Sequence, residues 1–289
     1  MSTWRVVILA VVQGLTELLP VSSSAHVVVA EKLMGMDPSS PEMTLLLVML
    51  HTGTMVAVIV YFWNQWRRAF FQSAAAFKRF AVLLIVATAI TGVVGETLAK
   101  LIEKFWFRGA PHAEVEDLFS HLELIAPALA AAGILILIAG IFEKRTSLPG
   151  TIGDVGLNAK QAGLIGFVQG LCLPFRGFSR SGATISTAML LGVVKVRAEE
   201  FSFALAVVLT PPVVGREVLR LVKAEHLTAG LGLSSALAPD IFGAFCAFVA
   251  GLLALKWLSR WLEGGRWYLF GIYCLVAAVA VAVLHHMGF

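Results

Sequence analysis

The sequence contains little charge and little cysteine. Only 14% of its 289 residues are Asp, Glu, Lys or Arg, about half the share that is usual in soluble domains. This excludes a soluble globular domain of this size. The three cysteines show no Cys-x-x-Cys spacing, so the sequence predicts neither a disulfide framework nor a thiolate metal site. The net charge of +4 is too small to indicate a nucleic-acid partner.

Apolar residues are abundant instead, and they are arranged in runs. They make up 58% of the chain, which indicates an integral protein of the lipid bilayer. Six runs approach the roughly 20 residues that cross a bilayer. They are Leu45–Trp63, Phe80–Gly95, Leu124–Phe142, Phe201–Gly215, Ile241–Leu255 and Trp267–Leu284. Four shorter or interrupted runs suit paired half-helices that enter the membrane and return, namely Val6–Thr16, Val27–Met36, Gln161–Phe175 and Gly182–Val194.

The tripeptide Gln-Gly-Leu begins the same pattern twice. It occupies positions 13–15 and 169–171, and each copy opens an apolar segment that runs into a serine-rich cluster. Each half then has one re-entrant pair followed by three spans, and an odd number of spans inverts the second half. The sequence therefore predicts an all-α polytopic membrane protein with an inverted-topology repeat, each half a re-entrant helical hairpin plus three transmembrane helices. Residues 1–289 form a single domain, with repeats at about 1–145 and 155–289.

Lys and Arg are unequally divided between the two membrane faces of this arrangement. One face holds 12 of the 22 and the other holds 7, with Lys32, Arg176 and Arg180 inside the hairpins. Because the richer face is normally cytoplasmic, we expect both termini and the mouth of the first hairpin to face outward. The acidic segment Glu114–His121, followed by Glu123, resembles a metal-binding cluster in composition, but it is interpreted as a solvated outer loop.

The tips of the two hairpins contain residues that suit an anion. Pro20 ends the first half-helix and Ser22–Ser24 start the next, which places backbone N–H groups and the positive end of a helix dipole at the cluster. In the second hairpin Ser179 or Ser181 starts a half-helix beside Arg180, whose guanidinium matches phosphate oxygens. Serines at such turns are also ordinary helix caps. Their occurrence at matched positions predicts a polyanionic ligand between the tips.

Further side chains near the first tip are candidates for chemistry. Gln13 and Glu17 share one helix face, and the Glu17 carboxylate suits either a divalent cation that bridges phosphates or an ion pair with a buried arginine. His26 lies three residues after Ser23, so it is a base for that hydroxyl, a nucleophile, or a hydrogen-bonded structural group. His51, within a span, either lines the pocket or serves in packing.

Two segments resemble a known family. The runs GLTELLPVSSSAH and GFSRSGATIS are similar to the two signature motifs of the bacterial undecaprenyl-diphosphate phosphatases, the bacitracin-resistance protein family. The flanking HTGTMVAV and Glu200–Phe203 segments fit as well, so the resemblance covers essentially the whole chain. It implies hydrolysis of the C55 isoprenyl diphosphate to the monophosphate at the outer face of the bacterial plasma membrane, which recycles the lipid carrier for peptidoglycan synthesis. It also implies bacitracin resistance and a divalent cation, Mg2+ or Ca2+.

The motifs can be compared position by position. The residues that match the family pattern are Glu17, Ser22, Ser23, His26, Ser179 and Arg180. Gln13 departs from it by replacing the first glutamate, and Arg176 by replacing the proline before Gly177. Because an amide oxygen holds a hard cation more weakly than a carboxylate does, Gln13 and Glu17 predict a weakened metal site. We hypothesise that the Arg176 charge partly replaces the missing metal charge.

The resemblance leaves the mechanism open at one point. The nucleophile is Ser23 with His26 as base, His26 itself, or a water activated by His26 or Glu17. Arg180 is expected to stabilise charge on the diphosphate. The residues predicted to bind the diphosphate are Ser22, Ser24, Ser179, Ser181 and Arg176. The competing functions are a lipid-phosphate transporter or flippase of the same architecture and an inactive binding protein, and the sequence is compatible with a homodimer.

Overall fold

The computed structural model describes residues 2–38, 40–106, 121–142, 157–227, 233–262 and 266–288. Within these ranges every regular element is a helix. Six of the described segments are long and apolar enough to cross a membrane: Glu42–Phe70, Ala74–Phe105, Leu122–Ile141, Lys195–Gly215, Ala238–Lys256 and Tyr268–His286. Each overlaps one of the six predicted runs, so the all-α polytopic membrane fold is confirmed. Most of the acidic segment (114–120), together with Lys144 and Arg145 from the charge count, lies outside the described residues.

Two short helices followed by three long ones occur twice along the chain. The first half contains α1 (Thr3–Thr16), α2 (Ser23–Leu33), α3 (Pro41–Phe70), α4 (Ala74–Trp106) and α5 (Leu122–Ile141). The second half contains α6 (Ala159–Cys172), α7 (Arg180–Leu190), α8 (Lys195–Leu227), α9 (Leu233–Leu262) and α10 (Tyr268–His286). The four short helices correspond to the four predicted half-helical runs. The inverted relation of the two halves stays a prediction.

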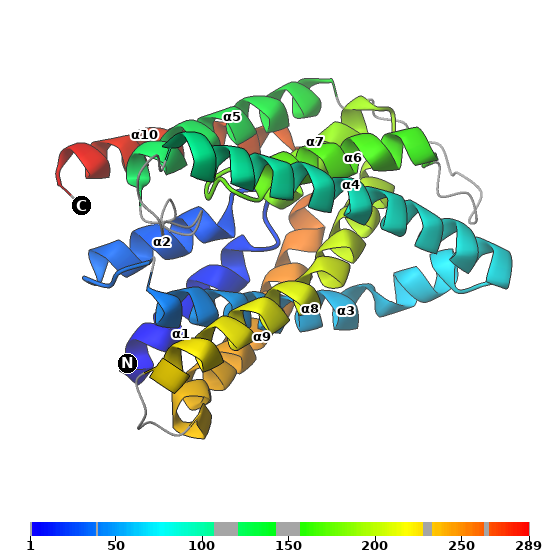
Figure 1. Ribbon diagram of the computed structural model, residues 1–289. Coiled ribbons are helices and arrows are strands. Elements are labelled where there is room, and N and C mark those ends of the chain that lie inside the picture. Colours follow the sequence, from blue (N-terminus) through cyan, green and yellow to red (C-terminus); the bar gives the residue numbers. More distant parts are fainter. Residues whose placement is uncertain are drawn as a thin grey trace.

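Helices of one half pack against helices of the other (Figure 1). α1 lies against α9 and α6 against α4, while α5 pairs with α10 and α3 packs on both α8 and α9. Each helix of the first half has a counterpart five helices later in the second half, so that α1 corresponds to α6 and α4 to α9. The α1–α9 pair therefore corresponds to the α6–α4 pair, while the α5–α10 and α3–α8 pairs each correspond to themselves. This reciprocity is what a duplicated unit predicts.

Glycines of the repeated tripeptide let the short helices approach their partners closely. A Cβ on Gly14 would lie 2.5 Å from that of Ala250 on α9, and one on Gly170 would lie 2.7 Å from that of Val94 on α4. At Gly53, where α3 meets α9, a Cβ would lie 1.9 Å from a carbonyl oxygen. Small residues at such crossings are typical of membrane helices, because van der Waals contact between closely approaching backbones drives their association.

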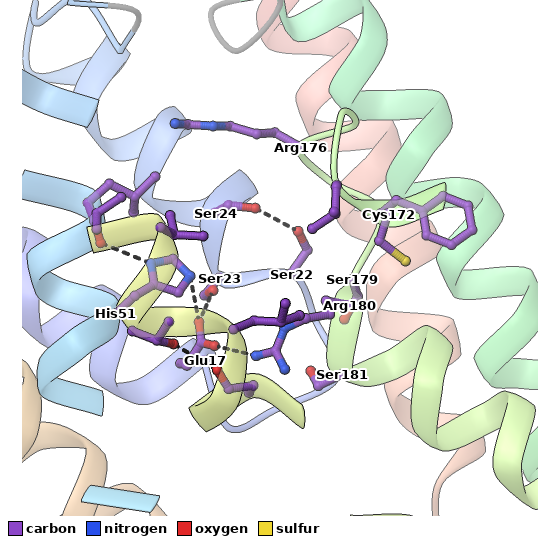
Figure 2. A pocket seen from close by; sticks show the side chains of 18 of the residues that line it. Glu17, Ser22, Ser23, Ser24, His51, Cys172, Arg176, Ser179, Arg180 and Ser181 are labelled. Carbon is purple, nitrogen blue, oxygen red and sulfur yellow. Dashed lines mark hydrogen bonds and ion pairs between the residues drawn. The ribbon is translucent and has the colours of Figure 1, made fainter. Parts of the chain in front are cut away.

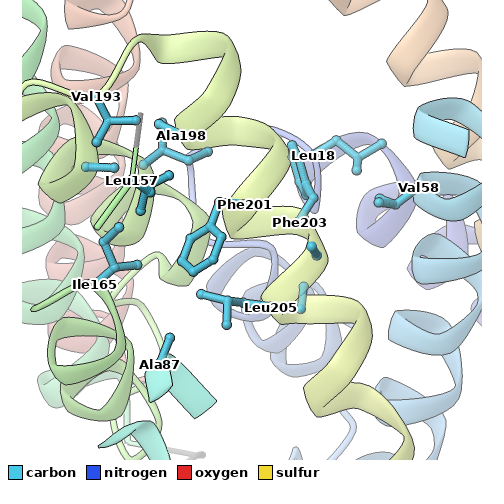
Figure 3. Close-up of a cluster of buried hydrophobic side chains, with 14 of the residues drawn as sticks. Leu18, Val58, Ala87, Leu157, Ile165, Val193, Ala198, Phe201, Phe203 and Leu205 are labelled. Carbon is cyan, nitrogen blue, oxygen red and sulfur yellow. The ribbon is translucent and has the colours of Figure 1, made fainter. Parts of the chain in front are cut away.

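A cluster of apolar side chains holds α8 against the rest of the molecule (Figure 3). Phe201 is fully buried, and Phe203 stacks on Phe62 of α3 with ring centroids 5.3 Å apart. Leu205 of the same helix belongs to this cluster, as does Leu18 from the turn after α1. The packing positions the following turns of α8, which form one wall of the cavity at the hairpin tips.

Candidate active site

The tips of the two hairpins meet inside the protein, as the sequence predicts. The first tip is the turn between α1 and α2, and the second is the segment between α6 and α7. Arg180 Nη2 donates to Glu17 Oε1 at 2.9 Å, and Ser181 Oγ donates to the Leu19 carbonyl at 3.5 Å. The ion pair is largely buried, with 21% of the Arg180 side chain and 3% of the Glu17 side chain exposed. Residues 163 positions apart therefore form one site.

The second helix of each hairpin begins in a different way. Ser22, before α2, has a φ of 65°, and it alone among the described non-glycine residues has a positive φ. Its hydroxyl makes no cap hydrogen bond to α2 and lies 3.4 Å from that of Ser24. Ser179, in contrast, accepts a hydrogen bond from the Gly182 N–H at 3.2 Å and so caps α7. Because the Ser22 side chain does not cap α2, the first backbone N–H groups of this helix receive no hydrogen bond from it. Such N–H groups at a helix N-terminus favour the binding of an anion.

Glu17 is the centre of the hydrogen-bond network at the tips (Figure 2). Its Oε1 accepts from Arg180, and its Oε2 accepts from the Ser23 hydroxyl. The same Oε2 also accepts from Gln13 Nε2 at 2.8 Å. His51 Nε2, on α3, lies 3.1 Å from the same Oε2. The structure thus shows the ion pair with a buried arginine that was one of the two alternatives for Glu17.

His51 takes part in this network, and it lines the cavity rather than serving in packing alone. Its Nδ1 lies 2.9 Å from the Leu47 carbonyl oxygen, and its Nε2 faces the Glu17 carboxylate. Both neighbours are hydrogen-bond acceptors, so only the doubly protonated, cationic ring donates to both. The side chain is 30% exposed. The one sequence signal for this residue is a polar side chain within an apolar span.

His26 lies on the side of α2 that faces α5 and α10. Its Nδ1 is 2.8 Å from the Ser22 carbonyl oxygen and its Nε2 is 2.7 Å from the Tyr273 hydroxyl, with the two rings stacked 5.7 Å apart. The ring lines a second, largely apolar cavity of about 330 Å³ formed with α5 and α10. Among the described residues no hydrogen bond joins His26 to the Ser23 hydroxyl, and these contacts match the hydrogen-bonded structural group that was one of the three alternatives for His26. The ring bonds back to the carbonyl four residues earlier, while the hydroxyl bonds to Glu17.

A cavity of about 270 Å³ lies between the two tips and is bounded by α3 and α8. Its charged and hydroxyl lining residues are Glu17, Ser22, Ser23, Ser24, His51, Arg176, Ser179, Arg180, Ser181 and Thr210. All five residues predicted to bind the diphosphate are among them. Arg180 Nη1 is buried and has no hydrogen-bond partner among the described residues, so it remains available to a ligand. Leu47 and Met55 of α3 and Leu209 of α8 contribute to an apolar wall.

The residues around Glu17 do not form the predicted divalent-cation site. Both carboxylate oxygens already accept hydrogen bonds, and Gln13 presents its amide nitrogen to Glu17 rather than its oxygen. In the part of the chain that the structure describes, no three His, Cys, Asp or Glu side chains gather as metal ligands would. Mg2+ and Ca2+ require several converging oxygen ligands, so this donor set does not fit them. Arg176 lies at the end of the cavity away from Glu17, and His51 is the second basic group beside that carboxylate (Figure 2).

Comparison with known proteins agrees with the motifs. The family model described as "Bacitracin resistance protein BacA" matches residues 6–280. A protein of Acinetobacter baylyi named Undecaprenyl-diphosphatase 2 is 58% identical over 287 residues, covering 98% of this chain and 98% of its own. Undecaprenyl-diphosphatase 2 of Burkholderia orbicola is 33% identical over 290 residues, or 96% of this chain and 95% of its own. Undecaprenyl-diphosphatase 1 of Burkholderia pseudomallei is 34% identical over 291 residues, with the same coverage. The two motifs, the helical membrane fold and these full-length matches show that the chain belongs to the bacitracin resistance protein BacA family.

Proposed function

We propose that the protein hydrolyses undecaprenyl diphosphate to undecaprenyl phosphate and inorganic phosphate, the activity after which its full-length relatives are named. The observation that carries this proposal is the position of the Ser23 hydroxyl, which donates to Glu17 in the cavity that Arg180 also lines. A hydroxyl nucleophile, its hydrogen-bond acceptor and a cation for phosphate oxygens thus share one cavity. Bacitracin resistance and recycling of the lipid carrier for peptidoglycan synthesis follow from this hydrolysis.

The first chemical step transfers the terminal phosphoryl group to Ser23. A bond forms between Oγ and the terminal phosphorus, the bond from that phosphorus to the bridging oxygen breaks, and undecaprenyl phosphate leaves with the electron pair. The hydroxyl proton passes to Glu17 Oε2, to which Ser23 already donates. Because phosphoryl transfer proceeds through a loose transition state, the position and charge of the surrounding groups matter more than a strong base.

Water releases the phosphate in the second step. It attacks the phosphorus of phosphoserine, the bond between phosphorus and Oγ breaks, and Oγ recovers its proton from Glu17. One water proton remains on the departing inorganic phosphate and the other passes to solvent, so Glu17 ends the cycle as a carboxylate. Arg180 donates to the phosphate oxygens through Nη1, which has no partner among the described residues, while its Nη2 holds Glu17. The apolar wall from α3 and α8 suits the first units of the isoprenyl chain.

We infer that the chain lies in the bacterial plasma membrane with both termini outside and the cavity open to the outer face, on the support of the 12-to-7 division of Lys and Arg. One chain supplies both hairpins, so the cavity needs no second copy. In single-cysteine variants, Ser2→Cys and Met287→Cys should react with a membrane-impermeant thiol reagent in intact spheroplasts. Labelling of either position only after lysis would contradict this orientation.

Phosphate release by the purified protein tests the activity itself. In detergent with undecaprenyl diphosphate, Ser23→Ala should lower the rate by about 1,000-fold or more. Ser202→Ala serves as the control, because Ser202 is also a buried serine and, on α8, does not line the cavity. If the wild-type protein released no more phosphate than Ser23→Ala, hydrolysis would be excluded. Transfer of undecaprenyl phosphate across vesicle membranes would then test the transporter alternative.

A further inference from the structure

His51 occupies the place beside Glu17 where the sequence predicted a metal ion. It comes from α3, which belongs to neither hairpin, and its Nε2 lies 3.1 Å from Glu17 Oε2. The hydrogen-bond geometry at Nδ1 and the Leu47 carbonyl, 2.9 Å apart, fixes the ring so that Nε2 points into the site. The ring also lines the cavity, so a ligand that reaches the Ser23 hydroxyl lies within its reach.

The cavity lining is richer in positive than in negative groups. Among the described lining residues Glu17 is the one acid, whereas Arg176, Arg180 and His51 are basic. Glu17 accepts from Arg180 on one oxygen and faces His51 with the other. A diphosphate has at least two negative charges near neutral pH. Two cationic side chains on either side of Glu17 therefore provide the charge that a divalent ion would otherwise supply.

We propose that His51, in its imidazolium form, binds the diphosphate together with Arg180 and serves as the second cation of the phosphate site. This inference rests on the proposed hydrolysis and adds a residue to it. When the substrate enters, its terminal oxygens accept from Nε2 beside Glu17, and the ring stays held through Nδ1. His51 thus replaces His26 as the histidine that touches the reacting phosphate.

The other groups that face His51 support a titratable cation there. Glu17 faces it from the end of α1, and Arg180 faces the same carboxylate from α7. Arg176 and Cys172 line the cavity from the second hairpin, and α8 adds the hydroxyl of Thr210. α9, which also packs on α3, adds no residue to the lining. Within the cavity Glu17 is therefore the group that stabilises a positive charge on His51.

Two substitutions at this position separate charge from hydrogen bonding. His51→Gln retains a neutral N–H donor, whereas His51→Lys retains a positive charge that does not titrate near neutral pH. The measurements are kcat/KM for phosphate release and the affinity for a short-chain isoprenyl methylenediphosphonate, each between about pH 6 and 9, where a histidine titrates. His121→Gln is the matched control, because His121 hydrogen-bonds to Glu123 outside the cavity.

We expect His51→Gln to lower both quantities about 10- to 100-fold at the acidic end of this range, as loss of a charge-assisted hydrogen bond does. In the wild-type protein both quantities should fall as the pH rises and His51 loses its charge, and in His51→Gln this fall should disappear. His51→Lys should restore binding with a flat pH profile. A wild-type pH profile in His51→Gln, or binding in His51→Lys no better than in His51→Gln, would overturn the assignment. If the wild-type protein neither bound the analogue nor released phosphate, the proposed function itself would fail instead.

Discussion

Removing both charges of the Glu17–Arg180 ion pair should destabilise the protein less than the sum of the two single removals. With Nη2 and Oε1 2.9 Å apart and an effective dielectric constant of about 20, the two charges attract each other by about 6 kcal/mol. Desolvation offsets most of this in the intact pair. Once one partner is removed, the buried charge that remains is unpaired, and such changes cost about 3–5 kcal/mol.

The two single variants should differ in how much stability they lose. Arg180→Gln leaves Glu17 beside His51, which still compensates its charge. Glu17→Gln leaves Arg180 and His51 without their shared carboxylate, so it should have the larger effect. In Glu17→Gln/Arg180→Gln we expect a coupling free energy of about 3 kcal/mol relative to the sum of the single variants.

Equilibrium unfolding in mixed micelles of a mild detergent and dodecyl sulfate measures these differences in stability. The Arg197–Glu200 pair on α8 is a matched control, because its atoms are 2.7 Å apart and its side chains are 24% and 4% exposed. It does not line the cavity, so its variants should change stability without changing phosphate release. Additivity of Glu17→Gln and Arg180→Gln within about 0.5 kcal/mol would refute the reasoning, because independent sites behave in that way.

Three further substitutions test the metal site, the first tip and the helix packing. Gln13→Glu places a second carboxylate beside Glu17 and so provides a donor that suits Mg2+, which the wild-type residues lack. Added Mg2+ should therefore raise phosphate release by this variant and not by the wild-type protein, and an equal response of the two proteins would contradict this effect of the amide. Ser22→Gly should raise the free energy of unfolding by about 1 kcal/mol, because glycine adopts the left-handed conformation of this position without strain. A lower free energy of unfolding would show that the Ser22 hydroxyl stabilises the protein by more than the backbone strain costs. Gly53→Ala should lower the free energy of unfolding by at least about 2 kcal/mol in the same assay, because its Cβ would collide with the Ala244 carbonyl oxygen of α9. Gly92→Ala is the control, since a Cβ there meets nothing within 4 Å, and equal effects of the two substitutions would argue against the close crossing of α3 and α9.

The spans could be predicted from the sequence because a bilayer imposes a simple requirement on length and polarity. Backbone groups must be satisfied within each spanning segment, so long apolar runs become helices. The half-helices were predictable for a related reason, because Pro20 and the serine cluster interrupt an apolar run. The hydrogen bond between Gln13 and Glu17 also follows from spacing, since residues four apart share a helix face.

The contacts of the two histidines could not be predicted from their spacing in the sequence. His26 is close to Ser23 along the chain, but the direction of its ring depends on the Ser22 carbonyl and on Tyr273 of a distant helix. His51 is close to Glu17 because α3 packs beside the first hairpin, a contact that no local pattern encodes. The site was thus predictable in its residue types and in the meeting of its two tips. The identity of its nearest histidine required the tertiary packing.

Glu17 and Arg180 enter the membrane at different times during synthesis. At about 5–20 residues per second, the 163 residues between them correspond to a delay of about 8–30 s. His51, 34 residues after Glu17, follows within about 2–7 s and is then the nearest group able to compensate the carboxylate. During this delay the first half of the chain lies in the bilayer with Glu17 but without its partner Arg180. Either half produced alone would expose its member of this pair to lipid and would be a substrate for membrane quality-control proteases, whereas the two halves produced together would protect each other.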